Sequence, residues 1–357
     1  MPVRNFERID SNDDVTTTKT LLHEAIPLTG TIVSGTYGAF RSEKNIKNFT
    51  HGQFQSVYDY PFLSSSANHI FDITLGYDES SALSGSTAVY VQNSKKINMY
   101  NQFAQVLLGY TSSTGDGIRK FERDLTLDGD AYMRECFFLS FSRLLTKDQI
   151  KKGTFSIKLA TGSWGNSKNG TFHKTISDLS ASINGDGTLN TDGGDYGVLY
   201  SGSGGDNATG CGVIFYQAGI AVITASVFAN TTNDFNVEAG QPTKDISESL
   251  SGSAISSSCD AFRHRLVNLS FNNTTQINSK IYFCRVPHNK FNYSSNPTYV
   301  SGSKIVVKNQ SVDHPVSYIT TVGLYNDSKE LVAVAKLSEP LRKDPTNDLT
   351  LRVRLDY

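Results

Sequence analysis

Charged residues are scarce in this chain. They make up 19% of its 357 residues, whereas about 25% is usual for globular proteins. Lys and Arg (33) almost balance Asp and Glu (34), which leaves a formal net charge of −1. A chain with so little net charge has no overall electrostatic attraction to nucleic acid or to an anionic membrane. The sequence therefore predicts neither as a partner.

Cysteine and long apolar runs are also rare. The four cysteines are far apart in the sequence: Cys136, Cys211, Cys259 and Cys284. They do not form the dense disulfide framework of small secreted domains, so we predict reduced, buried thiols.

The stretch Met1 to Arg8 lacks the apolar core of a signal peptide, so we expect synthesis in a cytosol without secretion. The longest apolar stretch, Val213 to Phe228, is too short to cross a bilayer and predicts a buried pair of strands.

Motifs of common enzymes are missing. The sequence contains neither a Gly-x-Ser-x-Gly elbow nor a His-Glu-x-x-His pair, and nothing in it identifies an acid–base pair of carboxylates. The glycine-rich stretch Ser201 to Gly212 lacks the Lys-Ser/Thr ending of a phosphate loop. We therefore predict a protein that is not an enzyme.

Three patterns superficially resemble binding sites. The set Cys259, His264, Cys284 and His288 has donor types that suit zinc, but its spacing matches no common zinc finger. The stretch Asn184 to Asp195 alternates oxygen side chains as a calcium loop does, yet it lacks the central glycine and the final glutamate. We expect buried thiols and a solvated turn instead, and hence no metal or cofactor. The basic triplet Arg263–Arg265 could bind phosphate, but a salt bridge between subunits is the favoured interpretation.

The residues that are abundant favour strands and turns. Ser, Thr, Asn and Gly fill the place of the missing charges, and 20 Phe with 17 Tyr supply the mass of a core. The fold class predicted is mainly β, with antiparallel sheets or β-sandwich domains and one or two short helices. Apolar residues spaced by three and four, an initial Ser94 and a final Gly109 predict a helix at about 94–109. A second short helix is expected from Thr146 to Lys152.

Changes in composition suggest three regions. Residues 1–30 are polar and rich in Thr, and we expect an N-terminal arm there. Residues 31–160 are expected to form a mixed β domain with one helix. Residues 161–357 are expected to form a β-sandwich-like domain with long Gly/Ser/Asn loops and a C-terminal hairpin.

The C-terminal part of the chain has the clearest pattern. Two apolar runs, starting at Ser317 and Leu331, flank a polar turn from Asn326 to Glu330, which predicts a β-hairpin. The last run, Leu349 to Tyr357, alternates apolar and polar residues with a period of two, as a half-buried strand does. We therefore predict that the chain ends within a sheet.

This C-terminal pattern also carries a resemblance. The segments Ile319–Asn326 and Leu331–Ala335 resemble a hairpin of tailed-bacteriophage tail proteins, found in the domain that joins collar and tail fibres to the baseplate. Together with Phe291–Tyr299 and Gly219–Thr224, they resemble virion structural proteins of contractile-tailed phages of marine cyanobacteria. The resemblance implies a non-enzymatic subunit of the tail, baseplate or fibre-attachment region, located in the virion. It would form a homo-oligomer beside other virion structural proteins.

Assembly of this kind requires exposed strand edges and aromatic anchors. The candidate interface residues are Tyr318, Ile319, Leu324, Tyr325, Leu331, Val353, Leu355, Tyr357, Tyr293 and Tyr299. One alternative is a receptor-binding or capsid decoration module whose Gly/Asn/Ser-rich loops, at 160–212 and 229–258, bind a host-surface glycan. Another alternative is a hydrolase attached to the particle.

Overall fold

The structure is a computed structural model in which strands dominate. It describes residues 6–27, 44–85, 91–110, 117–124, 130–164, 172–178, 181, 188–201, 209–229, 234–237, 243–252, 254–294, 297–301, 304–305 and 312–357. Most strands belong to one large sheet with antiparallel pairing, so the predicted mainly β class is confirmed. The sequence also predicts a strand from Thr31 to Phe40, which lies outside the described residues.

The chain divides into two compact units. Unit 1 consists of Met1–Leu21 and Gln276–Tyr357, and unit 2 consists of Leu22–Thr275. The expected boundary near residue 160 falls inside unit 2, at the end of a core strand. The expected N-terminal arm is replaced by strand β1 (Val15–Pro27), which pairs with β13. Its run of Thr, Val and Leu suits a strand because β-branched residues pack well on a pleated surface.

Unit 2 is built on a continuous set of strands in the order β7-β8-β10-β11-β12-β5-β4-β3-β2. The strands of this unit are β2 (Ile46–Asn48), β3 (Gln55–Tyr58), β4 (His69–Tyr77), β5 (Glu135–Phe141), β6 (Gln149–Ile150), β7 (Ser156–Ala160), β8 (His173–Ser177), β9 (Thr188–Thr191), β10 (Gly194–Ser201), β11 (Thr209–Phe215) and β12 (Ile220–Thr224). The predicted buried strand pair is present as β11 and β12. Three further strands, β8 to β10, lie in the stretch at 160–212, where the sequence predicts turn clusters between short strands.

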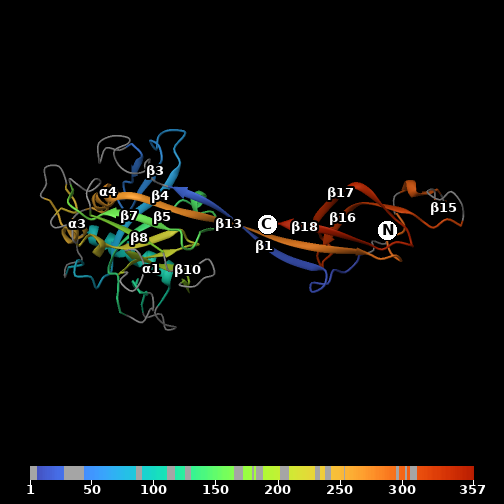
Figure 1. Cartoon of the computed structure of the whole chain (residues 1–357), viewed down its shortest axis with the longest axis horizontal. Helices are drawn as coiled ribbons and strands as arrows, with labels where there is room; N and C mark the ends of the chain where they lie inside the picture. Colours follow the sequence, from blue (N-terminus) through green and yellow to red (C-terminus); the bar gives the residue numbers. More distant parts are fainter. Residues whose placement is uncertain are drawn as a thin grey trace. The chain divides into compact units, whose positions relative to one another are not determined.

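The central strands of unit 2 are buried on both faces. In β5, Phe138 packs on one face and Phe137 on the other, as alternation along a strand requires. Helix α1 (Val91–Leu108) packs against β4 on the Phe138 face of the sheet (Figure 1). The ring of Phe103 in this helix stacks on that of Phe138, with centroids 4.3 Å apart. This helix confirms the expected one, with a start three residues earlier.

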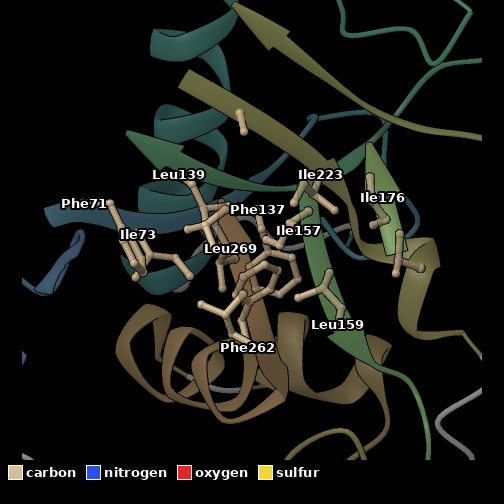
Figure 2. Packing of buried hydrophobic residues seen from close by; sticks show 14 of the residues in the cluster. Phe71, Ile73, Phe137, Leu139, Ile157, Leu159, Ile176, Ile223, Phe262 and Leu269 are labelled. Carbon is tan, nitrogen blue, oxygen red and sulfur yellow. The ribbon is translucent and has the colours of Figure 1, made fainter. Parts of the chain in front are cut away.

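The opposite face carries the larger core. Here helix α4 (Ile255–Arg265) brings Phe262 against Phe137, with ring centroids 4.8 Å apart. Figure 2 shows Ile157 and Leu159 of β7 beside these rings, together with Leu269 of β13 (Leu266–Val286). Strands β4, β5 and β12 are therefore enclosed between this cluster and α1, which explains the nearly continuous apolar sequences of β5 and β12.

The second expected helix, Thr146–Lys152, is wrong in its bounds. The chain forms a single turn, α2 (Arg143–Thr146), and then Lys147 adopts a positive φ of 55° that ends it. Strand β6 follows, in which Ile150 pairs with Asn273 of β13. Burial of Ile150 in this pairing outweighs the local helical pattern. The smaller helical elements of unit 2 are η2 (Ala225–Phe228) and α3 (Ile246–Gly252).

A buried carboxylate joins three parts of unit 2. Asp178 accepts hydrogen bonds from the backbone N–H groups of Gly153 (2.8 Å) and Phe155 (2.9 Å) and from the hydroxyl of Tyr216 (3.1 Å). Burial is the main influence on this carboxyl and raises its pKa to about 6, although the three hydrogen bonds oppose the shift. The folded protein therefore holds this proton more tightly than the unfolded chain does.

We expect this group to make the protein less stable as pH rises from about 4 to about 6. A folded pKa above the unfolded value means that the folded state binds more protons in this window, so the stabilisation is lost as pH passes the folded pKa. Between pH 5 and pH 7 the loss should be on the order of 1 kcal/mol. Urea unfolding of the wild type and of Asp178→Asn at both pH values measures it. An equal pH dependence in the two proteins would contradict the assignment.

Unit 1 contains the predicted C-terminal strands. Strand β18 (Leu349–Asp356) pairs with the end of β13, from Ser279↔Asp356 to Val286↔Leu349. The last residue is also fixed, since Tyr357 and Asn278 exchange two backbone hydrogen bonds. The predicted hairpin is formed by β16 (Ser317–Tyr325) and β17 (Leu331–Lys343). The remaining elements are η3 (Pro297–Tyr299), β14 (Val300–Ser301) and β15 (Lys304–Ile305).

Candidate interaction surface

The residues considered for zinc are divided between the two units. Cys259 lies in the core of unit 2, where its thiol donates to the carbonyl of Ile73, and the ring of His264 stacks on Trp164 at 4.0 Å. Cys284 and His288 belong to unit 1. Among the described residues, one acidic group, Glu122 with Asp124 and Asp130, has ligand atoms close enough for a metal ion. Exposed acidic groups of this kind are common in proteins that bind no ion, so we do not propose a metal site here.

The other patterns have internal roles where they are described. The carboxylate of Asp195, at the end of the calcium-like stretch, forms an ion pair of 2.6 Å with Lys152. The rest of that stretch up to residue 187, and residues 202–208 of the glycine-rich stretch, lie outside the described residues. Cys136, Cys211 and Cys259 are buried free thiols, as predicted, whereas Cys284 is partly exposed.

The basic triplet Arg263–Arg265 does not face a partner. Both arginines are buried in unit 2, and Arg263 forms an ion pair of 2.6 Å with Asp260 in the same helix. Arg265 donates to backbone carbonyls of its own unit. The expected salt bridge between subunits and the phosphate site are therefore both wrong here, because the guanidinium groups have no access to solvent.

The β16–β17 hairpin differs from these buried sites because much of it is exposed. The two strands form a two-stranded sheet of their own among the described strands. Their register runs from Ser317↔Lys343 to Tyr325↔Leu331, with irregularities at two places. At both irregularities β17 has more residues than β16: residues 337–340 lie opposite Thr320, and Val332 has no partner in β16. The turn between the strands is closed by hydrogen bonds between Asn326 and Glu330.

One face of this hairpin carries a connected apolar surface, which we call the hairpin patch: Phe6, Tyr325, Leu331 and Val334. The ring of Phe6 meets that of Tyr325 edge-on at 5.0 Å. Tyr325 and Leu331 are cross-strand partners that lie over Gly323, and Val334 is opposite Gly323 on β17. All four patch side chains are exposed, and Val334 keeps 52% of its surface accessible.

The ten candidate interface residues fall into three groups. The exposed ones are Tyr318, Tyr325, Leu331, Tyr357 and Tyr293. Ile319 and Leu355 are half-buried. Leu324, Val353 and Tyr299 are buried within the chain, so we do not include them in the surface. Phe6 and Val334 were not among the candidates. Alternation along β17 could have identified Val334, but no local pattern places Phe6 beside Tyr325.

Comparisons with protein-family models, with curated proteins and with solved structures found no match. No described helix is both long enough and apolar enough to cross a membrane. The functional argument therefore depends on the hairpin and its surface.

Proposed function

We propose that this protein is a non-enzymatic structural subunit of a tailed-phage virion, in the tail, baseplate or fibre-attachment region. The observation that supports an assembly role is the hairpin patch. A two-stranded hairpin is at best marginally stable alone in water. Exposed apolar residues on it favour burial by a neighbouring subunit, since covering one large apolar side chain contributes about 1.5–3 kcal/mol.

The kind of assembly is proposed from the sequence of the same hairpin. Its residues Ile319–Asn326 and Leu331–Ala335 are the ones that resemble a hairpin of phage tail proteins. The glycan-binding alternative has no comparable support in the described part of the chain. The only tryptophan in the sequence is Trp164. Its ring stacks on His264 and lies 5.9 Å from the guanidinium of Arg265, so it already packs against side chains of its own unit.

Incorporation into particles tests this proposal. We expect a chain that ends at Val316 to be lost from virions, because it lacks the whole hairpin, and copy number measured by quantitative mass spectrometry of purified particles should fall at least tenfold. Since this chain also lacks β18, a point variant is needed beside it. Val334→Asp places a charge in the patch, and Val106→Asp on α1, also an exposed valine, is the matched control. Normal copy number for both the shortened chain and Val334→Asp would overturn the proposal.

A further inference from the structure

We infer that β16 pairs edge to edge with β16 of a second copy of this chain, in antiparallel orientation. This inference rests on the proposed function and names the partner of the hairpin. Its basis is the contrast between the two free edges of the hairpin. Among the described strands, β16 and β17 pair with each other and with no other strand, so each has one open edge of backbone N–H and C=O groups.

The edge of β17 is protected against another strand. Proteins protect edges with charged side chains, proline and bulges. Strand β17 has all three: both irregularities of the hairpin insert residues into it, and Pro340 lies within the larger one. Three of its exposed side chains are charged: Lys336, Glu339 and Arg342. A strand that approached β17 would meet a distorted edge without a full set of donors.

The edge of β16 has none of these features. Its nine residues, Ser317–Tyr325, form one continuous strand and contain no proline and no charged residue. Thr320, Thr321 and Tyr325 are exposed along it. A long, regular and uncharged edge is the form that pairs with an additional strand. Since β17 is protected and β16 is not, the hairpin is suited to extension on one side only.

A second copy fits this edge because the strand is self-complementary. A charged residue at the centre of a strand faces its own copy when the strand pairs with itself, and like charges directly opposite each other are destabilising. Strand β16 avoids this in every register. Full overlap of the nine residues around a two-fold axis places Thr321 opposite Thr321 of the second copy. The same register pairs Thr320 with Val322, and such β-branched pairs stabilise antiparallel sheets.

The test uses charges at the central position. Thr321 pairs with Lys336 within the hairpin, so Thr321→Glu adds a favourable pair inside one chain while placing two glutamates opposite each other between chains. Light scattering of the purified full chain should give twice the 39.1 kDa of the monomer for the wild type, and half of that mass for Thr321→Glu. The matched control is Ser338→Glu on the protected β17, which should keep the mass of the wild type.

A mixing experiment then identifies the partner. The double variant Thr321→Lys with Lys336→Glu preserves the pair within the hairpin and should also be a monomer. Mixed in equal amounts with the Thr321→Glu chain, it should restore the dimer mass, because Lys and Glu now face each other between copies. Restoration supports pairing of β16 with β16.

Two results would overturn the inference: a wild type that stays monomeric, or a dimer that Thr321→Glu leaves intact. Either of them leaves the proposed function standing if the chain that ends at Val316 is still lost from particles. Normal incorporation of that shortened chain overturns the proposed function, whatever the mass in solution. The two failures are therefore distinguishable.

Discussion

Replacing Arg265 by methionine should lower the free energy of unfolding by about 3–5 kcal/mol, the range for losing one partner of a buried charged network. The guanidinium is fully buried and donates to the backbone carbonyls of Phe235 (3.2 Å), Ala160 (3.2 Å), Gly162 (2.7 Å) and Asp234 (2.7 Å). Methionine fills a similar volume but has no donor, so these carbonyls lose their partner. Each buried polar group without a partner costs about 1–3 kcal/mol.

Urea unfolding followed by tryptophan fluorescence measures this effect directly. Trp164 is the only tryptophan and belongs to the same unit as Arg265. The control is Arg143→Met, because Arg143 is exposed in that unit and donates one hydrogen bond, to the carbonyl of Gln217. The control should change the free energy of unfolding by about 0.5 kcal/mol or less. If Arg265→Met had the same midpoint as the control, the four hydrogen bonds would not stabilise the unit.

Replacing Gly76 by alanine should also destabilise unit 2, by about 1–3 kcal/mol as for other overpacked cores. Gly76 lies in β4 where α1 crosses it. A Cβ atom at this position would be 2.6 Å from the backbone oxygen of Lys96 and 2.7 Å from the backbone nitrogen of Tyr100. Both neighbours are backbone atoms of a helix, so they cannot rotate away as a side chain would. The strand or the helix must move instead.

Gly252→Ala is the matched control for this prediction. Gly252 is the last residue of α3 in the same unit, and a Cβ atom there would have no neighbour within 4 Å. Because alanine is the better helix former, this change should leave stability unchanged or raise it by up to about 1 kcal/mol. A thermal midpoint that is lowered equally by both substitutions would show that close packing of β4 on α1 is not the cause.

Regular periodicity was the part of the fold that could be predicted. The alternation of the last strand, the hairpin and the helical spacing after Ser94 each depend on residues that are neighbours in sequence, and all three elements are present. The bounds of β8, β9 and β10 could not be predicted, because Gly, Asn and Ser at their ends are equally typical of turns and loops. Strand β1 was missed because its Thr-rich start has little apolar alternation.

The role of Arg265 could not be predicted because its partners are remote. Arginine is rarely buried, and the carbonyls that it binds lie 30 to 105 residues away in sequence. The same limit applies to the hairpin patch. The sequence identified Tyr325 and Leu331, but Phe6 reaches Tyr325 only through the fold of unit 1.

The division into two units determines which part of the chain can fold first during synthesis. Unit 2 is a single continuous segment, whereas unit 1 combines residues 1–21 with residues 276–357. Domains fold as units and commonly begin during synthesis. Unit 2 can therefore fold on the ribosome, while residues 1–21 must wait for residues 276–357 to emerge. Strand β16 emerges only after unit 2, so nascent chains on one polysome would complete the edge inferred above late in synthesis.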